Sequence, residues 1–93
     1  MSEAWFKDRS VTTRQILQAL RDFDATYPDT NTYENWLEKR TYKYAVQHDG
    51  KLYPPKHILS EATGISTKNY TGGAQTNNVF LHLGFNVIDK PQH

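Results

Sequence analysis

The chain has 93 residues, 37% of them hydrophobic and 23% charged, with a formal net charge of +1 at pH 7. A chain of this length forms one domain, and its aromatic share of 13% is too high for a disordered chain. The absence of cysteine excludes a disulfide framework, a thiolate nucleophile and a cysteine-based zinc site. No apolar run reaches the roughly 20 residues of a membrane helix, and no signal peptide opens the chain. We therefore expect a cytoplasmic protein with no membrane partner.

Charge is distributed unevenly along the chain. Residues 1–38 carry four basic and seven acidic side chains, whereas residues 39–88 carry six basic and two acidic ones. A basic half can form a surface for a polyanion, but small domains also show such splits by chance. Both interpretations remain open at this point.

The first predicted element is a long amphipathic helix. Thr12 and Gln15 form a capping box, and Val11 can pack on Ile16 as a hydrophobic staple. Apolar residues then recur at helical spacing, at Ile16, Leu20, Phe23 and Tyr27. The helix must end before Pro28, because the residue that precedes a proline disfavours helical geometry. A short helix over residues 32–38, presenting Trp36 and Leu37, follows the turn after Pro28.

A β-hairpin is predicted next. Residues 42–48 alternate with a period of two, and Asp49-Gly50 is a preferred pair for a two-residue type I′ turn. This turn places His48 opposite Lys51 and Val46 opposite Tyr53. The expected core face carries Tyr42, Tyr44, Val46 and Tyr53, and the other face carries Lys43, Ala45, Gln47 and Leu52.

Two further short helices and a strand complete the expected fold. Pro54-Pro55 ends the hairpin and opens a helix that stops at Gly64. After a polar loop, a helix over residues 74–83 stops at Gly84, and Phe85, Val87 and Ile88 form a strand that can join the hairpin. The predicted fold is a small α+β domain with a three-stranded antiparallel sheet. It spans residues 11–89, with tails at residues 1–10 and 90–93.

Catalytic motifs are not found. His57 and Glu61 lie four residues apart and can meet on one helical face, but this spacing favours a solvated helical pair over a catalytic one. The zinc-protease, nucleophile-elbow and P-loop motifs do not occur. We expect no enzyme, no cofactor and no metal site, while a hydrolase based on His57 and Glu61 stays as a remote alternative.

The segment of residues 68–78 suggests binding. Two glycines precede a helix N-terminus, whose unpaired N–H groups suit a phosphate, and polar residues crowd its first turn. A simple turn with solvated side chains is the other interpretation, and the residues of this segment by themselves favour it. Lys56, in the first turn of the preceding helix, opposes the helix dipole, which fits an anionic partner, a pairing with Glu61 or Asp49, or a tolerated surface lysine.

Three stretches carry a family resemblance: VTTRQILQALRDFD, YAVQHDGKLYPPKHILSEATG and YTGGAQTNNVFLHLGFNVI. Together, over residues 11–88, they resemble the N-terminal head domain of ScoMcrA-like HNH endonucleases, bacterial restriction enzymes that attack modified DNA. The resemblance implies that cleavage, and recognition of a base or sulfur, belong to separate domains. The residues that match the family pattern are Tyr53, Lys56, Gly72, Gly73, Thr76, Asn77, Gly84 and Phe85. Capping and core packing explain Gly84 and Phe85.

The leading hypothesis is a non-catalytic DNA-binding module, with reading of modified DNA as its more specific form. Cations at Lys39, Arg40, Lys43, Lys51, Lys56 and Lys68 would contact phosphates. The polar side chains of Asn69, Gln75, Thr76, Asn77 and Asn78, beside the turn at Gly72 and Gly73, would read base edges or accept a flipped base stacked on Tyr53 or Tyr70.

A protein-interaction or dimerisation domain without DNA affinity is the alternative function. It predicts an exposed apolar patch around Trp5, Phe6 and Trp36. Exposed tryptophans would favour a protein partner, such as other domains of a nuclease, and buried tryptophans would favour DNA.

Overall fold

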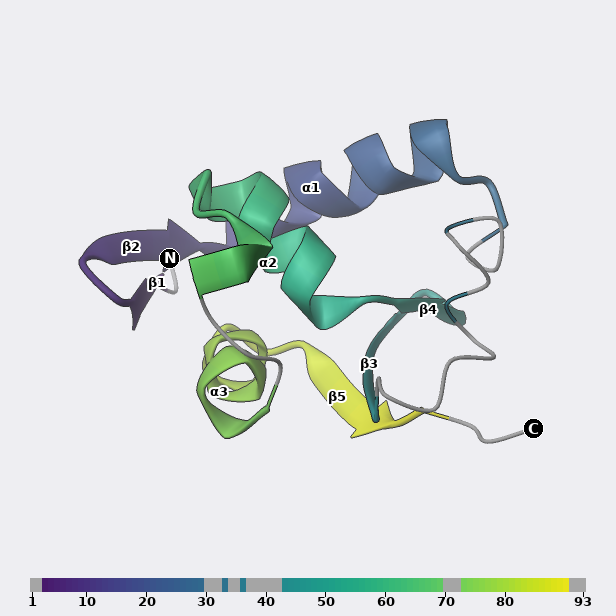
Figure 1. Ribbon diagram of the computed structural model, residues 1–93. Coiled ribbons are helices and arrows are strands. Elements are labelled where there is room, and N and C mark those ends of the chain that lie inside the picture. Colours follow the sequence, from purple (N-terminus) through teal and green to yellow (C-terminus); the bar gives the residue numbers. More distant parts are fainter. Residues whose placement is uncertain (1–2, 30–32, 34–35, 37–42, 70–72, 91–93) are drawn as a thin grey trace.

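The strands and helices form an α+β arrangement with two separate sheets (Figure 1). The computed structural model describes residues 3–29, 33, 36, 43–69 and 73–90. The elements, in chain order, are β1 (Glu3–Phe6), β2 (Arg9–Thr12), α1 (Thr13–Thr26), β3 (Tyr44–His48), β4 (Lys51–Tyr53), α2 (Pro55–Thr63), the 3₁₀ turn η3 (Thr67–Asn69), α3 (Ala74–His82) and β5 (Asn86–Asp89). The short helix expected over residues 32–38 lies mostly outside the described residues, although Trp36 N–H donates to the Tyr33 carbonyl oxygen at 2.9 Å.

The start of α1 confirms the capping box. The Gln15 N–H donates to Thr12 Oγ1 at 3.2 Å, and the Thr12 N–H donates to Gln15 Oε1 at 2.9 Å. Val11 and Ile16 are both fully buried in the core, as a hydrophobic staple requires. The helix ends at Thr26, before Pro28, as predicted.

The predicted three-stranded antiparallel sheet is also confirmed. Its strand order is β4-β3-β5, with all pairs antiparallel. His48 pairs with Lys51 and Val46 with Tyr53, the register that the Asp-Gly turn predicts. Both turn residues have positive φ, 51° at Asp49 and 77° at Gly50, which a type I′ turn needs. The turn therefore sets the register of β4 against β3.

The distribution of side chains over the two faces of this sheet corrects one prediction. Tyr44 is 39% exposed, whereas Ala45, expected on the outer face, is fully buried. Lys90 accounts for the burial of Ala45: its ammonium donates to the Trp36 carbonyl oxygen at 2.6 Å and lies 4.8 Å from the centre of the Trp36 ring. Because strand side chains alternate, Lys90 shares a face with Ile88 and with Ala45, the residue that pairs with Ile88. Trp36 therefore covers the second face, so both faces of the sheet are partly buried.

The N-terminal residues correct a second prediction, the tail over residues 1–10. Strands β1 and β2 form a hairpin in which Ala4 pairs with Val11 and Phe6 with Arg9. Ala4 and Phe6 point into the core beside Val11. Lys90, assigned to the C-terminal tail, is likewise buried. Residues on both sides of the expected boundaries are thus buried against the rest of the fold.

Two glycines end helices as expected. Gly64 closes α2 with a φ of 78°, and Gly84 follows α3 with a φ of 90°. The helix α3 ends at His82, one residue before the predicted end, and buries Val79 and Phe80. In Figure 1, α1 and α2 lie side by side above, while α3 lies below them next to the first hairpin.

Candidate nucleic-acid interface

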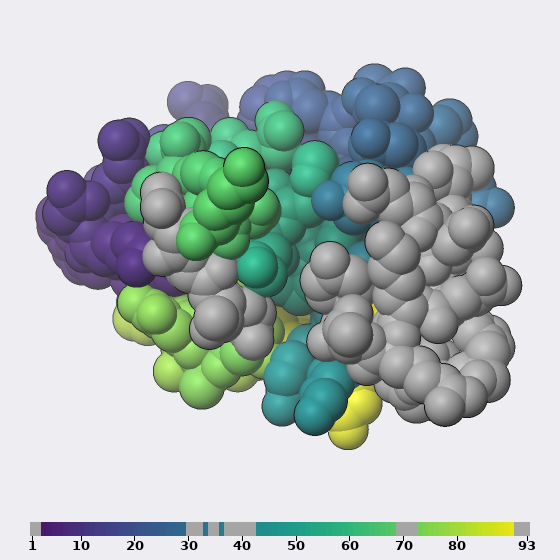
Figure 2. Space-filling view, viewed as in Figure 1, coloured from purple at the N-terminus to yellow at the C-terminus, as the bar shows by residue number. Residues whose placement is uncertain are grey.

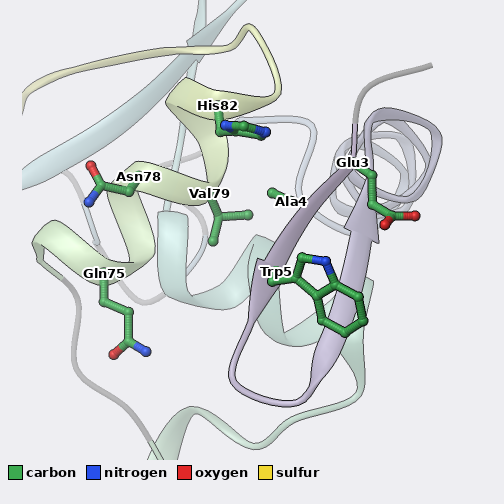
Figure 3. A pocket seen from close by; sticks show the side chains of 7 residues that line it. All are labelled: Glu3, Ala4, Trp5, Gln75, Asn78, Val79 and His82. Carbon is green, nitrogen blue, oxygen red and sulfur yellow. The ribbon is translucent and has the colours of Figure 1, made fainter.

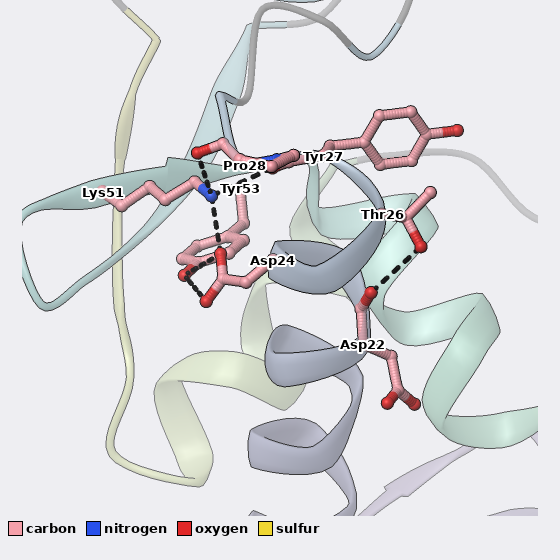
Figure 4. A network of polar contacts seen from close by, with 7 residues as sticks. All are labelled: Asp22, Asp24, Thr26, Tyr27, Pro28, Lys51 and Tyr53. Atoms are coloured by element: carbon pink, nitrogen blue, oxygen red, sulfur yellow. Dashed lines mark hydrogen bonds and ion pairs between the residues drawn. The ribbon is translucent and has the colours of Figure 1, made fainter.

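Lys51, a predicted DNA contact, binds the C-terminal end of α1 (Figure 4). Its Nζ donates to Asp24 Oδ1 at 2.6 Å and to the carbonyl oxygens of Tyr27 and Pro28, each at 3.1 Å. These three acceptors use all three N–H donors of the ammonium. The negative end of the helix dipole adds to the attraction. Lys51 therefore has a structural role, and no donor is left for a phosphate.

Tyr53, the predicted stacking platform, is also part of this network. Its hydroxyl donates to the Asp24 carboxylate, 2.9 and 3.0 Å from the two oxygens, and its ring centre lies 5.6 Å from that of Phe23. Burial of the hydroxyl raises the pKa of Tyr53 well above its usual value, and the hydrogen bond to Asp24 adds to the effect. Only 3% of the residue is exposed. The ring therefore offers no free face to a base.

The start of α3 places the remaining predicted readers in two environments. Thr76 and Asn77 are buried, whereas Gln75 and Asn78 are exposed. Asn77 Oδ1 is a buried acceptor that has no hydrogen-bond partner among the residues that the structure describes. Gly73 has an extended φ of 163°, a backbone that any residue adopts. Tyr70, Gly72 and the Asn69 side chain lie outside what the structure describes.

Three further predicted cations lie among the described residues. Lys56 is half-buried in the first turn of α2, Lys43 is exposed just before β3, and Lys68 is exposed in η3. Helix α2 contacts η3, which carries Lys68, and β3, which begins directly after Lys43. Lys39 and Arg40 fall outside the described residues.

A groove lies between β1 and α3 (Figure 3). Its volume is about 390 Å³, and its lining residues are Glu3, Ala4, Trp5, Gln75, Asn78, Val79 and His82. Trp5 is 69% exposed beside it. Figure 2 shows the first hairpin and α3 next to each other at one end of the molecule. The groove thus joins two predicted readers, Gln75 and Asn78, to an exposed indole.

Glu3 and His82 were not among the predicted binding residues, and Trp5 was predicted only for the exposed apolar patch of the alternative function. That patch does not form as predicted, because Trp5 is exposed whereas Phe6 and Trp36 are buried. The period-two pattern of residues 3–6 contains a signal for Trp5, because Ala4 and Phe6 point inward and Trp5 must then point outward. A pattern of four residues is too short to establish a strand on its own. The contact between β1 and α3 joins residues about 70 positions apart and has no local signal.

The sequence model of the ScoMcrA-like N-terminal head domain matches residues 9–89. The chain belongs to this family. The matched description is that of a head domain of a restriction protein, not of an HNH catalytic domain. No curated protein and no solved structure matches the chain.

Only one of the two walls of the groove lies within the residues that match the family. Strand β1 precedes the matched residues, whereas α3 lies within them. The head domain therefore supplies Gln75, Asn78 and His82, and the preceding strand supplies Glu3 and Trp5. Within the described part of the head domain and its preceding strand, no helix has the length and apolar character to cross a bilayer.

His57 and Glu61 of the head domain do meet, with 3.9 Å between His57 Nε2 and Glu61 Oε1. The imidazole packs among aromatic rings, with its centre 4.8 Å from that of Tyr33 and 5.6 Å from that of Phe23. This packing accounts for the histidine as part of the aromatic cluster at the end of α1. Across the described ranges, no cluster of three histidine or acidic side chains could hold a metal ion.

Proposed function

We propose that this head domain binds DNA without cleaving it and serves as a recognition module of a restriction protein. The observation that carries the proposal is the state of the exposed lysines. Among the described residues, neither Lys43 nor Lys68 makes an ion pair, whereas the ammonium of Lys51 is fully used. Both exposed lysines belong to the half of the chain in which basic residues outnumber acidic ones.

Lysine contacts to phosphates release counterions and give an affinity that falls with salt. Exposed amides, here Gln75 and Asn78, hydrogen-bond to phosphates or base edges. Because the net charge is only +1, we expect modest affinity for unmodified duplexes at physiological salt. The more specific form of the proposal, the reading of modified DNA, rests on these exposed amides and not on the family resemblance, which implies that separate domains recognise a base or sulfur.

Fluorescence anisotropy with short duplexes tests this function at low and physiological salt. The set contains unmodified, 5-methylcytosine, 5-hydroxymethylcytosine and phosphorothioate DNA. Binding to any duplex supports a DNA-binding head, and tighter binding to one modified duplex that survives added salt supports a reader. No binding to any duplex contradicts the proposal and favours a protein-interaction head that docks other nuclease domains.

Charge-reversal variants locate the contact surface. Lys43→Glu and Lys68→Glu should each weaken binding and lower the slope of log affinity against log salt by about 1. Arg21→Glu is the matched control, because it makes the same charge change on an exposed position of α1. An equal loss in the Arg21→Glu protein would mean that only net charge matters.

A further inference from the structure

We propose that the groove between β1 and α3 holds an unstacked nucleobase, with Trp5 as its stacking surface. This inference rests on the proposed DNA-binding function and deepens it. It locates base contact at a residue outside the segment that matches the family.

The Trp5 side chain is mostly exposed and is not part of the buried core. It is 69% exposed, more than Leu81 at 53% or Tyr44 at 39%, the other large hydrophobic residues that are exposed in the described parts. Its strand neighbours Ala4 and Phe6 point into the core, and its backbone pairs with that of Ser10. The hairpin therefore fixes the backbone of Trp5 at the rim of the groove, with the indole exposed. A base can stack on an indole of this kind, because every base has a π-face.

The opposite wall offers hydrogen-bonding groups. Gln75, Asn78 and His82 lie at positions i, i+3 and i+7 of α3, which share one side of a helix. Amide side chains carry both donors and acceptors, as base edges do, and Gln or Asn pairs with adenine in this way. Glu3, on the strand side, can accept a hydrogen bond from an exocyclic amino group.

The floor of the groove is apolar. Figure 3 shows Ala4 and Val79 between the strand side, with Glu3 and Trp5, and the helix side, with Gln75, Asn78 and His82. Ala4 and Val79 are 5% and 3% exposed, so they form a closed surface under the groove. A volume of about 390 Å³ is within the range of small-ligand sites.

The composition of the lining selects a base over other ligands. None of the seven lining residues is a lysine or arginine and one is a glutamate, which disfavours a phosphate or another anion. Four of the seven carry polar side chains around one indole, which disfavours the apolar face of a partner helix. A planar heteroaromatic group with hydrogen-bonding edges satisfies both the indole and the amides.

The test compares two duplexes of equal length, one fully paired and one with a single bulged base, by fluorescence anisotropy. We expect the full chain to prefer the bulged duplex and to show quenching of Trp5 fluorescence. Trp5→Ala should weaken binding of the bulged duplex by at least about fivefold, the lower end of base–aromatic stacking, and leave the paired duplex unchanged. Trp5→Phe should retain part of the preference.

Leu81→Ala is the matched control. Leu81 is an exposed apolar residue of α3, the helix that forms the opposite wall, but it does not line the groove. Circular dichroism should show that the exposed Trp5 can be replaced without loss of folding. Equal binding of both duplexes, or a preference that survives Trp5→Ala, overturns the nucleobase site while DNA binding stands. No binding of either duplex overturns the DNA-binding function itself, and the nucleobase site with it.

Discussion

Lys51 and Asp24 join β4 to the last turn of α1, with 2.6 Å between the ammonium nitrogen and a carboxylate oxygen. The same carboxylate accepts the Tyr53 hydroxyl, so two residues of one strand converge on one acid. The Lys51 ammonium also lies 5.7 Å from the centre of the Phe23 ring and 5.3 Å from that of Tyr53. This cluster holds the sheet against the helix.

Replacing Lys51 should therefore affect stability and not DNA binding. Lys51→Met removes the donor for Asp24 and for two carbonyl oxygens, at a cost of about 1–2 kcal/mol in the free energy of unfolding, since the lysine is partly exposed. Urea denaturation measures this change. Lys43→Met is the control and should lie within about 0.5 kcal/mol of the wild type. Loss of DNA affinity by a folded Lys51→Met protein would contradict the structural role.

Tyr53 should make the domain sensitive to alkaline pH. Its pKa is raised in the folded protein, so above a pH of about 10 the unfolded chain loses the phenolic proton while the folded protein keeps it. The unfolded state then binds fewer protons, and the free energy of unfolding falls as pH rises. Urea titrations between pH 8 and pH 11 measure the slope. Tyr53→Phe should show a shallower decline over this range; identical slopes would exclude Tyr53 as the cause.

Two glycines should respond differently to a side chain. A Cβ at Gly84 or Gly73 meets no atom within 4 Å, so backbone conformation alone decides the outcome. Gly84→Val forces a β-branched residue to a φ of 90° and should cost about 1–3 kcal/mol of stability. Gly73→Ala, at an extended φ, should be neutral or slightly stabilising. Thermal unfolding compares the two, and a large loss in Gly73→Ala would contradict this account.

Phe6 tests whether the N-terminal hairpin belongs to the domain. Phe6→Ala removes a ring that is only 1% exposed and should lower the free energy of unfolding by about 3–5 kcal/mol. The exposed neighbour Trp5 gives the control, because Trp5→Ala removes no core contact. Guanidinium denaturation measures the stability of both variants. Equal stability of the two proteins would mean that residues 3–6 are a tail and not part of the domain.

Local chemistry made several features predictable from the sequence. The capping box of α1, the Asp-Gly turn with its register and the glycine stop after α2 each depend on residues within four positions of one another. The residues that interact in these features are therefore close together in the sequence, so a local pattern predicts them. The family resemblance was also readable from three stretches of the sequence, and the family match over residues 9–89 confirms it.

Tertiary structure alone decided which candidate residues are available to a partner. Lys51 and Tyr53 are used by Asp24, which lies 27 and 29 positions away, and no local pattern connects them. Trp36 covers the second face of the sheet through Lys90, 54 positions away, which accounts for the burial of Ala45. Trp5 meets α3 in the same long-range manner. Side-chain alternation assigns residues to faces, but burial depends on what the rest of the chain packs against each face.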